Sequence, residues 1–181
     1  PEYEKLNKLK EGCLIIGLLN PFANKDLAKI LSDLKLSAIA LELLPRISRA
    51  QSSDVLSSQA NIAGYKSVLL AASELDRYFP MLMTAAGTVQ PAKVVVLGGG
   101  VAGLQAVATA KRLGALVFVS DIRPAVKEQV ESLGAKFIEL PEINEKPTEA
   151  GGYAKEVSSK FLEEQRNILT KYLSEADVAI C

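Results

Sequence analysis

Lys93-Val-Val-Val-Leu97, followed by Gly98-Gly-Gly-Val-Ala-Gly103, is the segment that says most about the fold of this chain. Its apolar residues are typical of a strand buried on both faces of a parallel sheet. The glycines match the pattern G-x-G-x-x-G, and apolar periodicity predicts a helix over 101–113 directly after them. A strand, a glycine turn and a helix in this order are the context in which the pattern binds a dinucleotide. The stretch therefore predicts a Rossmann-type α/β domain.

The glycines have separate expected roles, and an acid downstream completes the pattern. Gly98 permits the tight turn, Gly100 lets the backbone approach a pyrophosphate, and Gly103 lets the helix pack on the strand. Asp121 ends the next strand about 20 residues on, where a carboxylate can accept hydrogen bonds from both ribose hydroxyls. Arg123 could accommodate the 2′-phosphate of NADP, but the carboxylate is the nearer charge. The sequence favours NAD(H), with a glycine turn that binds FAD, an adenosine derivative or nothing as the alternative.

Downstream of this stretch, strands and helices continue to alternate. Strands are predicted at 115–120 and 136–140, with a helix at 125–133 between them. A polar loop, 141–152, leads into a helix from about 153 to 174, and the last residues indicate another strand. Such alternation implies a parallel sheet covered by helices on both faces.

Upstream, the chain repeats the βαβ pattern. Strands predicted at 13–19 and 37–44 flank a helix that begins near Asn24, and a polar loop then leads into a long helix over 54–79. Between Pro80 and Pro91 the periodicity breaks, which indicates a connector.

These patterns predict an α/β fold class, with two Rossmann-like βαβ domains that have parallel sheets. The C-terminal part of the first domain is expected at 1–83, and an NAD-binding domain, truncated on its C-terminal side, at 84–181. Because 177–181 indicates a strand that stops in mid-run, we expect the chain to be a fragment of a longer protein.

Composition excludes several classes of partner. Lys plus Arg and Asp plus Glu number 21 each, with no long run of either sign, so neither a nucleic-acid surface nor a basic membrane patch is expected. No stretch approaches the roughly 20 apolar residues that span a bilayer. Cys13 and Cys181 lack the spacing of metal ligands and are expected to be buried structural residues in a reducing cytosol. No metal site is predicted.

The chain contains no histidine, the residue that most often moves a proton in dehydrogenases. Hydride transfer between two nicotinamides needs no proton transfer, since the protein has only to align the rings and exclude water. The loop from Pro45 to Ser58 supplies hydrogen-bonding side chains for such a task. Its alternative interpretation is a solvated loop in which Asp54 or Ser53 caps the next helix and Arg46 pairs with a nearby carboxylate.

At these segments the sequence resembles the proton-translocating nicotinamide nucleotide transhydrogenases, specifically their NAD(H)-binding domain I, the alpha subunit of bacterial forms. The resemblance covers essentially the whole chain and rests mainly on the loop with its arginines, glutamine and aspartate. The matching stretches are Pro45-Arg-Ile-Ser-Arg-Ala-Gln51 with Ser52, Asp54, Ser57 and Ser58, then Ala63-Gly-Tyr65, Met83-Thr-Ala-Ala-Gly-Thr88, Val101-Ala-Gly-Leu-Gln-Ala106, Ala110-Lys-Arg-Leu-Gly-Ala115 and Gly151-Gly-Tyr-Ala-Lys-Glu156. One departure from the commoner pattern is the middle glycine of Gly98-Gly-Gly-Val101.

The resemblance implies a peripheral domain that binds NAD(H) and exchanges hydride with NADP(H) held on a partner domain III, coupled to proton translocation through membrane domain II. It also implies a homodimer on the inner face of the bacterial cytoplasmic membrane, or on the matrix side in mitochondria. The residues that it implies in catalysis are Arg46, Gln51, Asp54 and Ser57. Those that it implies in cofactor binding are Arg46, Ile47, Ser48, Arg49, Gln51, Ser57, Gly98, Gly99, Gly100, Val101, Gly103, Asp121, Ile122, Arg123, Gly152, Tyr153 and Gln165.

Within the family, the members of this set have different roles. Gln51 would bridge toward the partner cofactor, while Arg46, Asp54 and Ser57 would hold the NAD(H) nicotinamide and its carboxamide. Residues 99–101 would contact the pyrophosphate and 121–123 the adenosine end. Gly152 and Tyr153 would belong to a mobile loop that closes over the cofactor.

Two other interpretations remain. An alanine dehydrogenase resembles the same two-domain architecture and binds NAD, but its chemistry needs a histidine where this sequence has Leu19-Asn-Pro21. Alanine dehydrogenases also lack the loop with arginines, glutamine and aspartate. A non-catalytic NAD-sensing module would bind the nucleotide without transferring hydride.

Overall fold

The computed structural model describes residues 3–140 and 159–181. Its contacts divide the chain into two compact units, Pro1–Ser58 (unit 1) and Gln59–Cys181 (unit 2). The division falls within helix α2 (Val55–Glu74), whose C-terminal half packs in unit 2 through Val68, Ala71 and Ala72. The boundary between these two units, after Ser58, lies earlier in the chain than the domain boundary predicted between residues 83 and 84. The predicted domain boundary stays a prediction.

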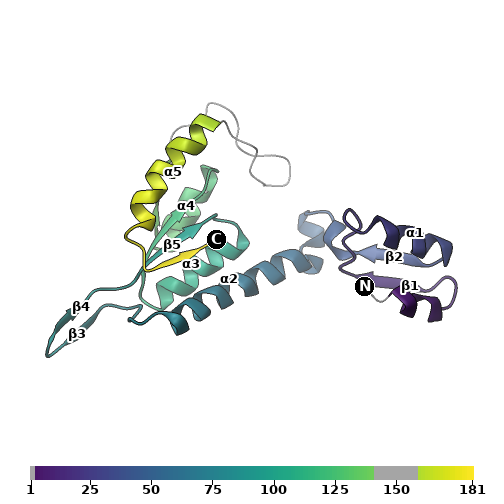
Figure 1. Cartoon of the computed structure of the whole chain (residues 1–181), viewed down its shortest axis with the longest axis horizontal. Helices are drawn as coiled ribbons and strands as arrows, with labels where there is room; N and C mark the ends of the chain where they lie inside the picture. The colour runs from purple at the N-terminus through teal and green to yellow at the C-terminus, as the bar shows by residue number, and fades with distance from the viewer. Residues whose placement is uncertain (1–2, 141–158) are drawn as a thin grey trace. The chain divides into compact units, whose positions relative to one another are not determined.

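Unit 1 is built around the predicted βαβ element (Figure 1). Strands β1 (Leu14–Gly17) and β2 (Ser37–Ala40) pair in parallel, with Leu14 opposite Ser37, and helix α1 (Lys25–Asp33) connects them. Short 3₁₀ helices complete the unit: η1 (Tyr3–Lys8), η2 (Leu41–Leu43) and η3 (Ser48–Ser53). The predicted strand at 37–44 ends early because the chain turns into η2 before Pro45.

Unit 2 contains a four-stranded parallel sheet in the order β7-β6-β5-β8 (Figure 1). Its strands and helices follow the predicted alternation. They are β5 (Lys93–Leu97), α3 (Val101–Arg112), β6 (Leu116–Ser120), α4 (Ala125–Ser132), β7 (Lys136–Phe137), α5 (Ser159–Leu173) and β8 (Val178–Ile180). Numbered from β5, the strand order is 3-2-1-4, the order of one edge of a doubly wound sheet. The order reverses beside β5, and this is where such sheets bind ligands.

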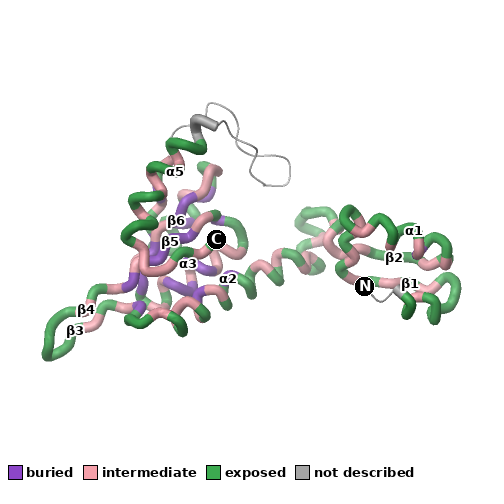
Figure 2. The backbone as a smooth tube through the Cα atoms, viewed as in Figure 1, coloured by how far each residue is buried: buried purple, intermediate pink, exposed green. Residues whose placement is uncertain are grey.

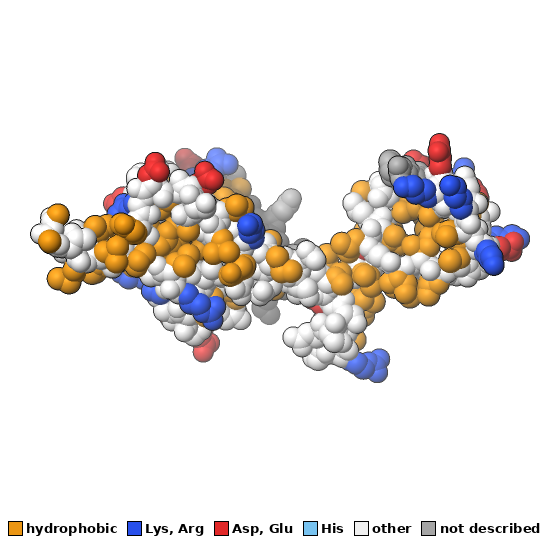
Figure 3. Space-filling model, turned by 90° about the horizontal axis from the view of Figure 1, so that it is seen from below, with side chains coloured by type: hydrophobic (Ala, Val, Ile, Leu, Met, Phe, Trp, Pro, Cys, Tyr) orange, Lys and Arg blue, Asp and Glu red, His pale blue; other side chains and the backbone are white. Residues whose placement is uncertain are grey.

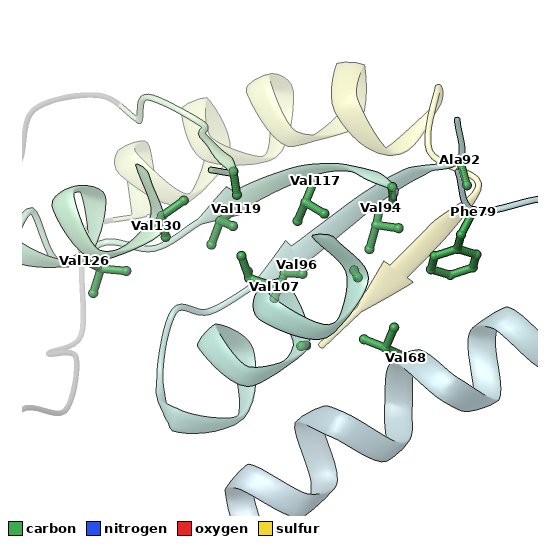
Figure 4. Packing of buried hydrophobic residues seen from close by; sticks show 14 residues of the cluster. Val68, Phe79, Ala92, Val94, Val96, Val107, Val117, Val119, Val126 and Val130 are labelled. Atoms are coloured by element: carbon green, nitrogen blue, oxygen red, sulfur yellow. The ribbon is translucent and has the colours of Figure 1, made fainter. Parts of the chain in front are cut away.

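Valines from five elements, α2, β5, α3, β6 and α4, dominate the core of unit 2. Val94 and Val96 of β5 pack with Val107 of α3 and with Val68 of α2, and Figure 4 shows these side chains meeting on one side of the sheet. All four are at most 1% exposed. Burial of one valine stabilises the fold by about 1.5 kcal/mol or more. On the other side of the sheet, Phe118 contacts Tyr172 of α5, with ring centroids 5.3 Å apart.

The close approach of α2 to α3 depends on a glycine. A Cβ at Gly64 would lie 2.0 Å from the carbonyl oxygen of Ala102 in the first turn of α3. Because Ala102 O is a backbone atom of a packed helix and cannot move aside, only glycine fits at position 64. Asn61 also donates a hydrogen bond to Gln105 at 3.1 Å. Helix α2 is thus held against the N-terminal half of α3.

The predicted connector between Pro80 and Pro91 is an antiparallel hairpin rather than an irregular loop. Strands β3 (Leu82–Thr84) and β4 (Gly87–Val89) flank a two-residue turn, and Gly87 has a positive φ of 130°. The hydroxyl of Thr84 closes the turn by donating to the carbonyl of Gly87. Met83 is 86% exposed, and hydrophobic side chains gather at this end of unit 2 (Figure 3). Strands of three residues are too short to show a period in sequence.

Burial differs between the units and corrects the expectation for the cysteines. Figure 2 shows buried residues gathered on the sheet and helices of unit 2, whereas the two strands of unit 1 are half-buried or exposed. Cys13 is half-buried and Cys181 is exposed, so neither is a core residue. Cys13 precedes strand β1, and Cys181 follows β8 beyond its last paired residue. Among the described residues, no helix is long and apolar enough to cross a bilayer.

Candidate functional site

The glycine turn lies at the carboxyl end of β5, at the start of α3. Gly98 has a φ of +100°, which glycine adopts without strain, and its N–H donates to the carbonyl of Ser120 at 2.8 Å. A Cβ at Gly103 would lie 1.8 Å from the carbonyl oxygen of Gly98, so this position too requires glycine. The predicted structural roles of these two glycines are confirmed by this geometry.

Gly100 is open to solvent and begins helix α3. Nothing lies within 4 Å of where its Cβ would be, and no side chain caps the helix there. The N–H groups of a first helical turn have no partner within the helix, and the helix dipole adds positive potential. Val101, 43% exposed, follows directly. This end of α3 can therefore accept an anionic group such as a phosphate.

Packing explains why the middle residue of the turn, Gly99, is a glycine. It is buried, and a Cβ there would lie 2.2 Å from Cγ1 of Val126 in α4. Its N–H donates to Oδ2 of Asp121 at 2.7 Å. The departure from the commoner pattern at this position thus coincides with tight packing of the turn between α4 and the end of β6.

Asp121 accepts four hydrogen bonds just beyond the end of β6. Besides Gly99 N–H, its carboxylate accepts the N–H of Arg123 at 2.8 Å, Nε of Arg123 at 2.9 Å and Nη2 of Arg123 at 2.8 Å. The Asp121 side chain is 6% exposed and that of Arg123 22%. This is a bidentate ion pair, the strong form of an arginine–carboxylate contact.

The charge of Asp121 is maintained by this environment. Burial alone would raise the pKa of Asp121. The hydrogen bonds from the Arg123 side chain, from its N–H and from Gly99, with the positive charge of Arg123, outweigh burial and hold the pKa below its ordinary value. The same contact raises the pKa of Arg123. Both groups are therefore ionised at neutral pH.

In unit 1, the loop after β2 forms a hollow of about 280 Å³. The residues that line it are Pro45, Arg46, Ile47, Ser48, Ala50, Gln51 and Asp54. Five of these were singled out from the sequence, and the 3₁₀ helix η3 brings them around one space. Arg49 and Ser57 do not line the hollow. Cationic, amide and carboxylate side chains there can donate and accept hydrogen bonds with a polar planar ligand.

Asp54 caps the following helix. Its carboxylate accepts the N–H of Ser57 at 2.9 Å and the hydroxyl of Ser57 at 2.7 Å, which is how an aspartate before α2 satisfies a free N–H of the first turn. The side-chain and backbone hydrogen bonds of Ser57 lower the pKa of Asp54, and the charge of Arg46 lowers it further. Asp54 and Ser57 thus form a hydrogen-bonded pair close enough to Arg46 to feel its charge, and the helix-cap interpretation holds for Asp54 as well.

Sequence reasoning did not single out Glu42, which fixes the turn after β1. Its carboxylate accepts the N–H groups of Leu19, at 2.9 Å, and of Asn20, whose φ is +46°. The pKa of Glu42 is lowered by its own N–H, and also by those of Asn20 and Leu19, against the effect of burial. An acid just beyond the end of a parallel strand was the available signal, because such ends meet at one edge of a sheet.

The remaining predicted residues lie elsewhere. Gly152 and Tyr153 lie outside the described residues. Gln165 is half-buried on α5, and Ile122 is half-buried between Asp121 and Arg123. Within residues 3–140 and 159–181, no group of three His, Cys, Asp or Glu side chains is arranged to hold a metal ion. The loop hollow and the glycine turn belong to separate units.

A parallel sheet with this strand order, a glycine turn at the reversal point and an acid after the second strand define a Rossmann-like α/β protein. The comparisons with known proteins agree. The family model described as "Alanine dehydrogenase/PNT, C-terminal domain" matches residues 67–181, and the model of the N-terminal domain matches residues 1–63. The chain therefore belongs to the alanine dehydrogenase/PNT family.

Individual relatives divide between the two branches of that family name. The chain is 54% identical over 173 residues to the first part of the NAD(P) transhydrogenase subunit alpha of Rhodospirillum rubrum, across 95% of this chain and 45% of that protein. It matches the crystal structure of a transhydrogenase from Sinorhizobium meliloti with a TM-score of 0.85 and 44% identity, over 99% of this chain and 47% of that one.

Alanine dehydrogenase is the more distant branch. The enzyme of Methanococcus maripaludis is 31% identical over 125 residues, across 67% of this chain and 33% of the relative. In all three comparisons this chain spans less than half the length of the relative.

Proposed function

We propose that this chain is the NAD(H)-binding portion of a transhydrogenase, in which hydride passes between NAD(H) on this chain and NADP(H) on a partner domain. The observation that carries the proposal is the hollow lined by Arg46, Gln51 and Asp54. Its side chains are suited to hold a carboxamide and to align two rings, a task that needs positioning rather than a general base. The chain's lack of histidine fits this chemistry.

The proposal also assigns a place to the rest of the nucleotide. The open backbone at Gly100 and the uncapped start of α3 would take the pyrophosphate, and Asp121 would take the adenosine ribose. Val101 would lie at the pyrophosphate with Gly99, and Ile122 at the adenosine. Gly152, Tyr153 and Gln165 stay in the proposed site through the family resemblance alone.

The contacts of the loop support the roles proposed for its residues. Asp54 with its hydrogen-bonded partner Ser57, and Arg46, whose charge acts on Asp54, would hold the nicotinamide of NAD(H). Gln51 would reach toward the NADP(H) ring, while Ile47, Ser48 and Arg49 would complete the contact surface. In this proposal Asp54 both caps α2 and orients Ser57, so its structural and functional roles coincide.

The proposed partners lie beyond this chain. We propose that it works with an NADP(H)-binding domain III and a membrane domain II, which couples hydride transfer to proton translocation. The relatives named as an alpha subunit support a protein of several subunits. A homodimer, peripheral on the inner face of the cytoplasmic membrane or on the matrix side, belongs to the same proposal.

An alanine dehydrogenase-like oxidoreductase is the second candidate, because the family name covers both activities. It predicts oxidation of NADH by pyruvate and ammonia. The lower identity, 31% against 54%, and the asparagine at position 20 favour the transhydrogenase.

The experiment that tests the proposal measures hydride transfer from NADH to an NADP analogue. The full-length protein is assayed with and without its NADP-binding partner, beside a reaction with pyruvate and ammonia. Transfer that requires the partner supports the proposal. Oxidation of NADH by pyruvate and ammonia instead contradicts it and leaves the loop at 46–57 with a structural role.

A further inference from the structure

Arg123 occupies half of the hydrogen-bonding capacity of Asp121 with its guanidinium. A carboxylate offers about four acceptor positions on its two oxygens. Here Oδ1 accepts the N–H and Nε of Arg123, and Oδ2 accepts the N–H of Gly99 and Nη2 of Arg123. All four positions are filled by this chain, so a ribose hydroxyl has to replace one of these donors before it can bind.

The four donors differ in how easily they can leave. The two backbone N–H groups belong to the main chain, where Gly99 is buried against Val126 and Arg123 lies in the turn just after β6, before α4 begins at Ala125. The guanidinium lies at the end of a flexible side chain that is 22% exposed. If it swings away, one acceptor position opens on each oxygen, at Oδ1 and at Oδ2.

The ribose of an adenosine nucleotide matches these two positions. Its 2′- and 3′-hydroxyls are neighbouring donors, one for each carboxylate oxygen, just as the arginine fork supplies one N–H to each. A ribose with a 2′-phosphate has a single hydroxyl left and brings further negative charge toward Asp121.

We propose that Arg123 is an internal competitor for the ribose site and that a nucleotide with an intact diol binds by exchanging two O–H donors for the two N–H donors of the guanidinium. This inference rests on the proposed NAD(H)-binding function and adds a specificity-determining residue to it. Because NADH binds only when the arginine fork is open, its apparent association constant is the intrinsic constant multiplied by the fraction of molecules with an open fork. The exchange also favours NAD(H) over NADP(H), because a ribose with a 2′-phosphate has only one hydroxyl left to replace the two donors.

The test is the dissociation constant of NADH, measured by titration calorimetry on the full-length protein and on two variants. Arg123→Ala removes the competitor and is expected to bind NADH about three- to tenfold more tightly. Arg123→Lys keeps the charge without the fork and is expected to lie between the two. The matched control is Arg112→Ala, an exposed arginine at the end of α3, for which no change is expected.

Thermal unfolding establishes that each variant is folded, and a crystal structure of the wild-type complex gives an independent measurement. In that complex Nε and Nη2 of Arg123 are expected to have left Asp121, with ribose oxygens in their places. Unchanged or weaker NADH binding in both Arg123 variants, or an arginine fork still closed on Asp121 beside bound NADH, overturns the exchange.

Asp121→Ala separates this inference from the proposed function. If it loses NADH binding while the Arg123 variants gain none, only the exchange is wrong. If it binds NADH as the wild type does, Asp121 is not in the site and the proposed nucleotide site itself fails.

Discussion

The glycine turn of unit 2 and the loop of unit 1 differ in what holds them. The turn is fixed by contacts far apart in sequence, such as Gly99 to Asp121 and Gly99 to Val126. The loop is fixed by neighbours, since Asp54 bonds to Ser57, and most of its side chains are exposed. Substitutions at the packed glycines of the turn, Gly99 and Gly103, should therefore destabilise the fold, whereas substitutions of exposed loop side chains such as Gln51 should change the chemistry of the site and leave the fold intact.

The largest effect is expected at Gly103. Helix propensity alone predicts that Gly103→Ala stabilises the protein by about 1 kcal/mol. Its Cβ, however, would lie 1.8 Å from the carbonyl oxygen of Gly98, so the strand and helix must separate. Because overpacking costs up to about 3 kcal/mol and the gain in propensity offsets about 1, we expect a net loss of about 2 kcal/mol in the free energy of unfolding, measured by urea denaturation.

Gly100→Ala is the matched control, because nothing lies within 4 Å of the new Cβ. Its stability should stay within about 0.5 kcal/mol of the wild type, while NADH binding weakens. Equal losses of stability in the two variants would contradict the separate roles of these glycines.

Asp121→Ala is expected to weaken NADH binding by about 1 to 3 kcal/mol, the range for losing hydrogen bonds to a charged group. Titration of the intrinsic NADH fluorescence measures the effect. Affinity equal to that of the wild type would show that the ribose binds elsewhere and would leave Asp121 with the structural role of holding Gly99.

Gln51→Asn shortens an exposed side chain of the loop by one methylene. We expect hydride transfer to slow about tenfold, because misplacing the ring contact costs rate, with NADH affinity nearly unchanged. Stability should stay within about 0.5 kcal/mol of the wild type. Single-turnover transfer and NADH titration test the two statements separately, and a large loss of NADH binding would contradict the role of Gln51.

A change in the pH dependence of stability is expected at Asp54, where Asp54→Ala removes a helix cap and Asp54→Asn keeps an oxygen acceptor. The pKa of Asp54 is lowered from 3.8, so the charge stabilises the folded state at pH values above 3.8. The advantage of the wild type over Asp54→Asn should therefore be constant near neutral pH and decline as the pH falls below 3.8. Thermal unfolding measured across pH would show this decline. A stability difference between wild type and Asp54→Asn that grows as the pH falls would contradict the stabilisation of the Asp54 charge by Ser57 and Arg46.

The alternation of strands and helices was predictable because each buried strand carries its own apolar run. The bounds of β5 are those predicted, and α3 ends one residue before the predicted end. The β3–β4 hairpin was missed because its strands are three residues long and exposed. The structural roles of Gly99 and Glu42 were not predicted, because their partners, Val126 and Leu19, are brought to them only by packing.

The class of the fold and the glycine turn follow from the sequence alone, because local periodicity and residue type carry that information, and most of the candidate site residues come from the family resemblance. The donors that meet at Asp121 become known only from the folded chain. The bidentate pair with Arg123 joins residues two apart, yet the bond from Gly99 spans 22 positions and exists because β5 and β6 are neighbours in one sheet. Long-range pairing of strands, which no local pattern encodes, is the physical reason for that difference.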